Sequence, residues 1–466
     1  MAKRRKRRGI SFGTLMMLLL TCMVCIGCFT ILPRLQGNTE LHVDATQVFS
    51  NLTLEGTLPD LSLRDIPITV TTREPTQAPA TALPTLQPEV QQLLATPTPA
   101  PSSLTLTLGG SIYVESGVRK SAYFSEADAY DFEEIMSLLA PEMQTDLCIV
   151  PLENLIIPDS KVSDLIAPEA ALSLLTVPGV DIVPIGFPKA YDQGMEGLSA
   201  TLTALRGRGL TPVGAYATAE DAQNPTLLTV NDVKVAVLHY VDEVSSTGTK
   251  KLKNEEATYA LPVAEAEAIA ADIAKARSAG AQLVIVSLRW GSVGKTSPTK
   301  DQTALAQAIA NSGADIIAGT GTKVVQPVVW LDGKNTDGTA KKVLCAYNLG
   351  ALLTEDRNKT AYISGVLLQM DLACSWDGTL TFQQLSYTPT YIWRYKQGSQ
   401  YQYRVLASDS TPPDAMSSDQ QEVMGRALST VQKALEDSVV TQQRVQHRII
   451  TTRDSLITKP KKKGFF

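Results

Sequence analysis

Histidine, the side chain most often used for metal ligation and proton transfer, is scarce in this sequence. The 466 residues contain three histidines, His42, His239 and His447, and no two of them have the spacing of a ligand pair. His239 lies in an apolar, strand-like run, where a hydrogen-bonded core histidine is the expected role. A transition-metal site built on imidazole is therefore not expected, whereas an all-oxygen Ca²⁺ or Mg²⁺ site stays open.

Other familiar catalytic arrangements are also missing from the sequence. A Ser/His/Asp triad would have to use His239, because the other two histidines lie near the ends of the chain. No nucleophile elbow is indicated, because the G-x-S-x-G match at residues 9–13 falls at the start of the apolar N-terminal run, and no complete G-x-x-x-x-G-K-S/T phosphate loop occurs. Basic stripes with interleaved aromatic residues are absent as well, so nucleic acid is not an expected partner.

The N-terminus has the composition of a membrane anchor. Residues 1–9 contain six basic and no acidic residues, and residues 10–32 carry no charge. As a helix with a rise of ~1.5 Å per residue, this apolar run crosses the ~30 Å hydrocarbon core of a bilayer. The basic residues favour a cytoplasmic N-terminus, so we predict a single-pass cell-membrane protein whose bulk is extracytoplasmic. A cleaved signal peptide and a lipoprotein attached through Cys28 remain alternatives.

The composition changes twice after the predicted anchor. Residues 33–73 are mixed and are expected to form a stalk, and residues 74–103 are rich in Pro, Thr, Ala and Gln, which favours an extended linker. Strand-like and helix-like runs then alternate, which predicts an α/β domain over 104–374, with ligand-bearing loops at the carboxyl ends of its strands. Residues 375–466 are expected to be a C-terminal extension, rich in strands and ending in a helix from about Asp419 to Asp437, with Ser418 or Asp419 as the N-cap.

Five segments, taken in order, resemble the CapA family of bacterial poly-γ-glutamate capsule synthesis proteins. They are LTLGGSIYV, TDLCIVPLEN, the run from VDIVPIGFPK to LTPVGA, AQLVIVSLRWG, and the run from GADIIAGTG to AYNLGAL. The resemblance covers somewhat more than half of the chain. It implies a metallophosphatase-like αββα sandwich as the ectodomain, carried on the N-terminal transmembrane helix, and a place in the cell envelope.

The same resemblance implies that most of the family's metal ligands are replaced. Of its polar positions, Glu153 and Asp192 are retained. Positions where the family has Asp, Asn or His ligands are occupied here by Ser111, Pro151, Phe187-Pro188-Lys189, Arg289, Thr320, Gly321, Lys323 and Ala351. We therefore expect no metal cofactor.

Three of the replacements introduce positive charge. Lys189, Arg289 and Lys323 would converge where a metal would bind, and their charge would oppose a cation there. They allow two interpretations: an anion pocket for a carboxylate or phosphate, or long basic side chains that reach solvent around a site without function. Glu153 is a candidate partner for Arg289 or Lys189, and Asp192 is expected to shape a turn.

Three hypotheses on function follow. The first is a non-catalytic binding or scaffolding module, a pseudoenzyme in the sense of the resemblance, whose partners would be an anionic envelope polymer or capsule-export proteins. The second is an active hydrolase or polymer-processing enzyme with a rebuilt site of Glu153, Asp192, Lys189 and Arg289, which requires these side chains to meet in one cleft. The third is a structural partner that assembles through its stalk and C-terminal helix.

Overall fold

The computed structural model describes residues 101–253, 255–375 and 378–442. Among these residues, no helix combines the length and the apolar character that a membrane crossing needs. The predicted anchor at 10–32 and the stalk at 33–73 lie outside the described residues, as does nearly all of the linker at 74–103.

The first sheet has eight strands, in the order β19-β18-β17-β1-β5-β8-β9, with β20 paired to β18. Its parallel half is made of β1 (Ser102–Gly109), β5 (Leu147–Ile149), β8 (Ile182–Pro184) and β9 (Thr211–Val213). Its antiparallel half is made of β17 (Ser364–Cys374), β18 (Leu380–Gln397) and β19 (Gln400–Ala407), and β20 (Thr441–Gln442) is short. The segment expected as a C-terminal extension therefore supplies strands to the same sheet as β1.

The second sheet has six strands, in the order β10-β11-β12-β13-β15-β14. They are β10 (Thr226–Val230), β11 (Val233–Val241), β12 (Leu283–Arg289), β13 (Ile316–Thr320), β15 (Ala340–Ala346) and β14 (Val328–Lys334). β10 and β11 form an antiparallel hairpin whose turn residues, Asn231 and Asp232, have φ angles of 48° and 65°. Asn and Asp tolerate this left-handed conformation, which is why the turn was predictable from the sequence.

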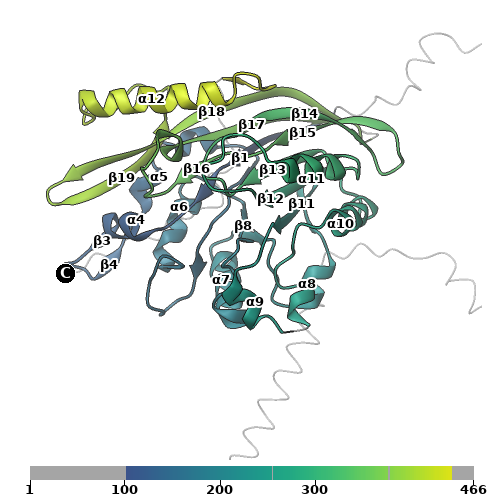
Figure 1. Ribbon diagram of the computed structural model, residues 1–466, viewed down its shortest axis with the longest axis horizontal. Helices are drawn as coiled ribbons and strands as arrows, with labels where there is room; N and C mark the ends of the chain where they lie inside the picture. Colours follow the sequence, from purple (N-terminus) through teal and green to yellow (C-terminus); the bar gives the residue numbers. More distant parts are fainter. Residues whose placement is uncertain (1–100, 254, 376–377, 443–466) are drawn as a thin grey trace, which may run out of the picture. The chain divides into compact units, whose positions relative to one another are not determined.

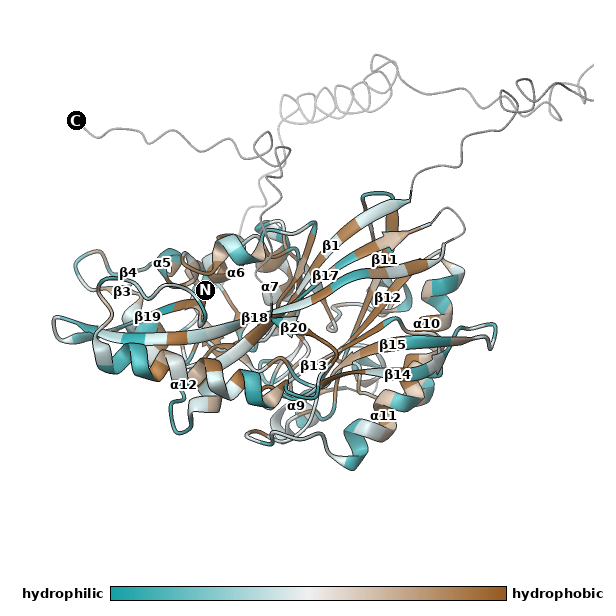
Figure 2. Ribbon diagram, turned by 90° about the horizontal axis from the view of Figure 1, so that it is seen from above, coloured by the Kyte–Doolittle hydropathy of each residue, from teal (hydrophilic) through white to brown (hydrophobic). Residues whose placement is uncertain are grey.

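Alternation along the strands builds a sandwich of four layers. Val235 and Val237 of β11 face a core between the sheets, together with Leu106 and Leu108 of β1. The intervening β11 residues face a second core that contains α10 (Ala266–Ser278) and α11 (Lys300–Ala310). A third core packs α7 (Gly194–Gly207) against the outer face of the first sheet. The fold is thus mixed α/β with an αββα order of layers, as Figure 1 shows, and its strands are largely hydrophobic in Figure 2.

The helices begin and end at local signals. The side chain of Thr299 and that of Gln302 form a capping box at the start of α11. The helix α12 (Ser418–Ala434) packs on β17 and β18 and has Ser417 as its N-cap, with Gln420 completing a second capping box. Our prediction of Ser418 or Asp419 as this N-cap is wrong by one or two residues, since three consecutive residues can all cap and their geometry decides among them.

Shorter elements complete the chain. The remaining helices are α4 (Ser116–Ser121), α5 (Glu133–Met136), α6 (Ser173–Thr176), α8 (Ala219–Gln223) and α9 (Ser246–Lys251), with 3₁₀ turns at Ala140–Met143, Glu169–Leu172, Glu256–Thr258 and Thr360–Ile363. The remaining strands are β2 (Ser111–Ile112), β3 (Tyr123–Phe124), β4 (Ala129–Tyr130), β6 (Leu155–Ile156), β7 (Ile166–Ala167) and β16 (Ala351–Leu353).

Candidate functional site

Loops from both sheets meet at a cavity of about 510 Å³, here called the central cavity. Glu153 follows β5, Lys189 follows β8, Arg289 is the last residue of β12, and Lys323 follows β13. All four side chains line the central cavity. The structure therefore brings together four of the five residues singled out from the sequence, at the carboxyl ends of parallel strands.

Glu153 is a buried carboxylate of the central cavity, with 7% of its side chain exposed. Its Oε1 atom accepts hydrogen bonds from the Tyr113 hydroxyl at 2.9 Å and from the Ser111 hydroxyl at 3.3 Å. Burial raises the pKa of Tyr113 well above its usual value, and the negative charge of Glu153 raises it further. Tyr113 therefore stays protonated and acts as a donor to the carboxylate.

Arg289 balances this carboxylate by charge without a hydrogen bond. Its Nε atom lies 3.6 Å from Glu153 Oε1, and its Nη1 atom lies 3.5 Å from Asp242 Oδ1. The buried Nε has no hydrogen-bond partner among the described residues. Burial opposes the charge of Arg289, but the Glu153 and Asp242 carboxylates outweigh it and the pKa of Arg289 is raised. The structure thus pairs Glu153 with Arg289 rather than with Lys189.

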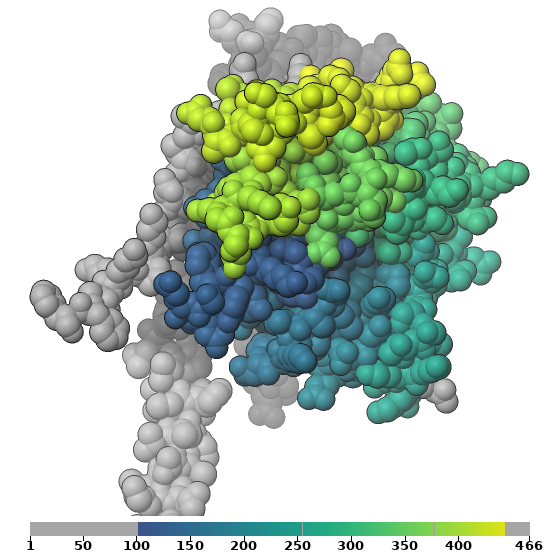
Figure 3. Space-filling model, turned by 60° about the vertical axis from the view of Figure 1, so that its left-hand side comes forward, coloured from purple at the N-terminus to yellow at the C-terminus, as the bar shows by residue number. Residues whose placement is uncertain are grey.

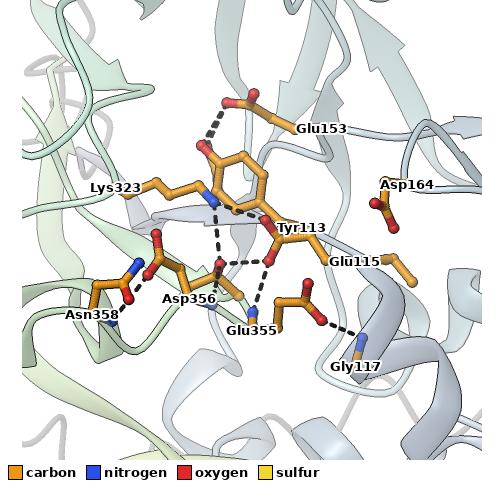
Figure 4. Close-up of polar contacts among 12 residues, drawn as sticks. Tyr113, Glu115, Gly117, Glu153, Asp164, Lys323, Glu355, Asp356 and Asn358 are labelled. Atoms are coloured by element: carbon orange, nitrogen blue, oxygen red, sulfur yellow. Dashed lines mark hydrogen bonds and ion pairs between the residues drawn. The ribbon is translucent and has the colours of Figure 1, made fainter.

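Lys323 is held in a closed network, drawn in Figure 4. Its Nζ atom donates to Glu115 Oε1 at 2.8 Å and to the Thr354 hydroxyl at 3.3 Å, and lies 4.4 Å from the centroid of the Tyr113 ring. The other oxygen of Glu115 accepts from the Thr354 hydroxyl and from the backbone N–H of Glu355. This ammonium group is therefore committed to a carboxylate and to an aromatic face, and joins the loop after β13 to those that follow β2 and β16.

Lys189 and Asp192 differ from these paired residues. Lys189 is exposed at the rim of the central cavity and takes part in none of the ion pairs of the described residues. Asp192 is not among the lining residues of the central cavity. Its carboxylate accepts from the Ser245 hydroxyl, and its main-chain carbonyl accepts from Lys251 Nζ at 2.6 Å. It thereby ties the loop after β8 to α9.

Comparison with known proteins connects this geometry to a family. The family model described as "Bacterial capsule synthesis protein PGA_cap" matches residues 105–356, which is more than half of the chain. The chain belongs to this family. The matched range contains Glu153, Lys189, Arg289 and Lys323, and ends just before the β17–β19 half of the first sheet.

Two curated relatives support the assignment. The "Capsule biosynthesis protein CapA" of Bacillus anthracis is 28% identical over 163 residues, 34% of this chain and 39% of that protein. The "PGA biosynthesis protein CapA" of Bacillus subtilis (strain 168) is 33% identical over 145 residues, 31% of this chain and 37% of that protein. The chain thus matches less than two-fifths of the length of either relative.

Solved structures with some likeness include two hydrolases. The Haemophilus influenzae NAD nucleotidase is 11% identical, covering 71% of this chain and 63% of its own, with a TM-score of 0.39. The calcineurin-like phosphoesterase YfkN of Bacillus subtilis is 12% identical, covering 72% and 99%, with a TM-score of 0.37. Likeness at this level carries no argument on activity.

The residues of the central cavity do not fit a metal ion. Among the described residues, no group of three or more His, Cys, Asp or Glu side chains is arranged to hold one. Glu153 and Glu115, the carboxylates that line the cavity beside Tyr113, already neutralise Arg289 and Lys323. A cation that bound to Glu153 or Glu115 would have to displace Arg289 or Lys323 from its carboxylate and leave that side chain without its partner.

His239 has the structural role expected from its apolar surroundings, which confirms that prediction. Its Nε2 lies 2.8 Å from the Gly186 carbonyl and its Nδ1 lies 2.9 Å from the Ser287 hydroxyl. A carbonyl can only accept, so Nε2 carries the proton and Nδ1 accepts from Ser287. Burial lowers the pKa of His239 to about 4, so the ring is neutral near pH 7.

Sequence reasoning missed Tyr113, Glu115, Asp242 and Glu355, which partner or line the central cavity. Tyr113 and Glu115 follow the predicted first strand, but nothing in IYVES marks them as functional. Glu355 belongs to a loop near the end of the family match. Their roles depend on contacts between residues far apart in the chain, which leave no local pattern.

Proposed function

We propose that this protein is a membrane-anchored, extracytoplasmic member of the capsule synthesis family that acts as a binding or scaffolding module of the bacterial envelope, without metal-dependent catalysis. Its partners would be an anionic envelope polymer or proteins of capsule export. The curated relatives are named for capsule and PGA biosynthesis, and this chain shares with them the family but only part of their length.

One observation carries the non-catalytic part of the proposal. The two cations at the base of the central cavity are both paired with carboxylates, Arg289 with Glu153 and Lys323 with Glu115. Hydrolysis of a phosphate or amide bond with metal assistance needs unpaired oxygen or nitrogen ligands that converge on an open coordination site. Here the charged groups are already paired, so they offer no free ligand to a metal ion.

The same pairing changes how the central cavity could bind an anion. Of its three cations, Lys189 alone is exposed and without an ion pair among the described residues. The cavity also contains the carboxylates of Glu153, Glu115, Asp164 and Glu355. Lys189 would therefore contact an anionic polymer at the rim of the cavity. Polar groups or neighbouring surfaces would supply the remaining contacts.

The membrane part of the proposal rests on the sequence. The basic block at 1–9, the uncharged run at 10–32 and the Pro- and Thr-rich run at 74–103 have the order of a tail, an anchor and a spacer. In this arrangement the capsule-family domain is presented outside the cell, where capsule polymer is found.

The alternative of a rebuilt hydrolase receives no support from the geometry. It needs Glu153, Asp192, Lys189 and Arg289 in one cleft, whereas Asp192 is held by Ser245 and does not line the central cavity. The remaining carboxylate, Glu153, accepts hydrogen bonds from two hydroxyl groups and faces Arg289, which leaves it poorly placed to act as a general base.

The full-length protein, purified from membranes, tests the proposal. We expect metal content far below one equivalent by elemental mass spectrometry, and no hydrolysis of a chromogenic phosphodiester with added Mg²⁺, Mn²⁺ or Zn²⁺. Stoichiometric metal together with turnover that Glu153→Gln abolishes would overturn it. The intact mass of the same preparation tests the anchor, because a lipoprotein or a cleaved signal would shorten the chain.

A further inference from the structure

A second cavity, of about 740 Å³, lies next to the central cavity and is here called the hairpin cavity. The two cavities share Glu115 and Glu355 as lining residues. The hairpin cavity lies between α4, the loop at 355–358 and the β18–β19 hairpin. Figure 3 shows the yellow-green hairpin lying against the blue segment that carries α4, and β19 contacts α4 directly.

Two half-buried arginines line the hairpin cavity. Arg357 donates from Nη1 to the Ile392 carbonyl at 3.0 Å. The guanidinium carbon of Arg394 lies 4.4 Å from the centroid of the Tyr401 ring, so the ring supports the guanidinium plane. Unlike Arg289 and Lys323, neither arginine takes part in an ion pair within the part of the chain that the structure describes.

Of the carboxylates that line the hairpin cavity, Glu115 is paired with Lys323, and the other two are held by backbone donors. Glu355 accepts from the backbone N–H of Gly117, and Asp356 accepts from the backbone N–H of Asn358 at 3.0 Å. Burial lowers the pKa of Arg357, and the positive charge of Arg394 lowers it as well. Two partly desolvated guanidinium groups that repel each other are stabilised by an anion placed between them.

The planar edge of a guanidinium group binds carboxylate and phosphate oxygens through paired N–H donors. An arginine stacked on a ring loses less conformational freedom when it binds, because the ring already orients it. Both arginines also lie outside residues 105–356, the range that the family model matches. The two arginines are therefore outside the family match, whereas Glu115 and Glu355, which the two cavities share, lie inside it.

We propose that Arg357 and Arg394 form an oxyanion-binding subsite in the hairpin cavity. It takes the carboxylate or phosphate groups of an extended polymer that runs on past Glu115 and Glu355 into the central cavity. The polymeric nature of the ligand rests on the proposed binding function, whereas oxyanion binding at the two arginines does not.

Binding to the full-length protein in detergent tests the subsite with two fluorescent probes: short poly-L-glutamate, a carboxylate chain, and short-chain polyphosphate. We expect Arg394→Gln and Arg357→Gln each to weaken binding of at least one probe about 10-fold to 100-fold, as the loss of a charge-assisted hydrogen bond predicts. Lys359→Gln is the matched control, since it removes an exposed positive charge that directly follows the loop at 355–358 but does not line the cavity.

The probe that responds identifies the oxyanion. Equal weakening by all three variants would show attraction to general surface charge and overturn the subsite, as would failure of both probes to bind the wild-type protein. Arg394→Gln carries the decision if Arg357→Gln does not fold, because Arg394 lies close to the exposed tip of the hairpin at 396–401. Metal-dependent turnover would overturn the proposed function and leave these binding results unaffected, so the two failures are distinguishable.

Discussion

Removal of one member of the Glu153–Arg289 pair should leave the other as an unpaired buried charge. The losses in the free energy of unfolding of the two single variants should therefore add up to more than the loss in the variant that lacks both. The side chains are 7% and 14% exposed. Leaving a buried charge without its partner costs about 3–5 kcal/mol, whereas replacing a whole buried pair by residues of similar volume is often nearly neutral. The two single variants and the double variant therefore form an informative thermodynamic cycle.

The two single variants should differ. Arg289→Met leaves Glu153 with the hydroxyl donors of Tyr113 and Ser111, so we expect a loss of about 3 kcal/mol in the free energy of unfolding. Glu153→Gln keeps an acceptor for Tyr113 and leaves Arg289 beside Asp242, so we expect a loss of about 1–2 kcal/mol. With a double variant that loses about 2 kcal/mol, the coupling energy is about 2–3 kcal/mol.

Urea unfolding at pH 7, followed by tryptophan fluorescence, measures these free energies on the full-length protein. The exposed pair Glu422–Arg426 on α12 supplies a control cycle, because its side chains are 71% and 53% exposed. Such an exposed pair should give a coupling energy of about 0.5 kcal/mol or less. A coupling energy for Glu153 and Arg289 no larger than this control would refute the argument that burial makes this pair strongly coupled.

Two further predictions concern His239 and its neighbours. Because burial lowers the pKa of His239 to about 4, against about 6.5 in an unfolded chain, its contribution to stability is complete above about pH 6.5 and is lost as the pH falls towards 4. This contribution amounts to roughly 3 kcal/mol, so the urea midpoint of His239→Gln should change less between pH 7 and pH 4 than that of the wild-type protein. An unchanged dependence of the midpoint on pH would contradict the prediction. Gly214→Ala should cost about 2–4 kcal/mol by thermal unfolding, because its φ is +81° and a Cβ would overlap the His239 ring. Gly338→Ala, with φ +87° and open space around it, should cost only about 1 kcal/mol, and equal losses would rule out the overlap.

The alternation of elements and the edge at which the site lies were both predictable from the sequence. The Asn231-Asp232 turn between β10 and β11, and Gly280 and Gly313 beyond the ends of α10 and α11, are local signals, so the alternation of elements can be read from the sequence. The carboxyl ends of parallel strands meet at one edge of a sheet, so Glu153 and Arg289 could be placed together before the structure was known.

The state of the site was not predictable, because it depends on approaches between distant parts of the chain. Lys323 and Glu115 are 208 residues apart, and no pattern in either segment indicates that they pair. Once paired, Lys323 no longer contributes a free charge, and the expected pocket of three cations is left with Lys189 at its rim. Of the arginines of the hairpin cavity, Arg394 comes from a segment whose sequence predicts strands, and Arg357 comes from the loop after β16, so no local pattern places them together.

The position of β1 has a mechanical consequence. This strand lies in the interior of the eight-stranded sheet, and its residues from Ser102 to Gly109 all pair with β17. Ladder hydrogen bonds run perpendicular to the strands, so tension applied along β1 at Ser102 loads them together in shear instead of breaking them one after another. The other end of β1 leads within a few residues to Tyr113 and Glu115 at the two cavities. If a polymer bound there were pulled while the chain before Ser102 was held, the force would act along β1. This single strand is difficult to extract from its sheet.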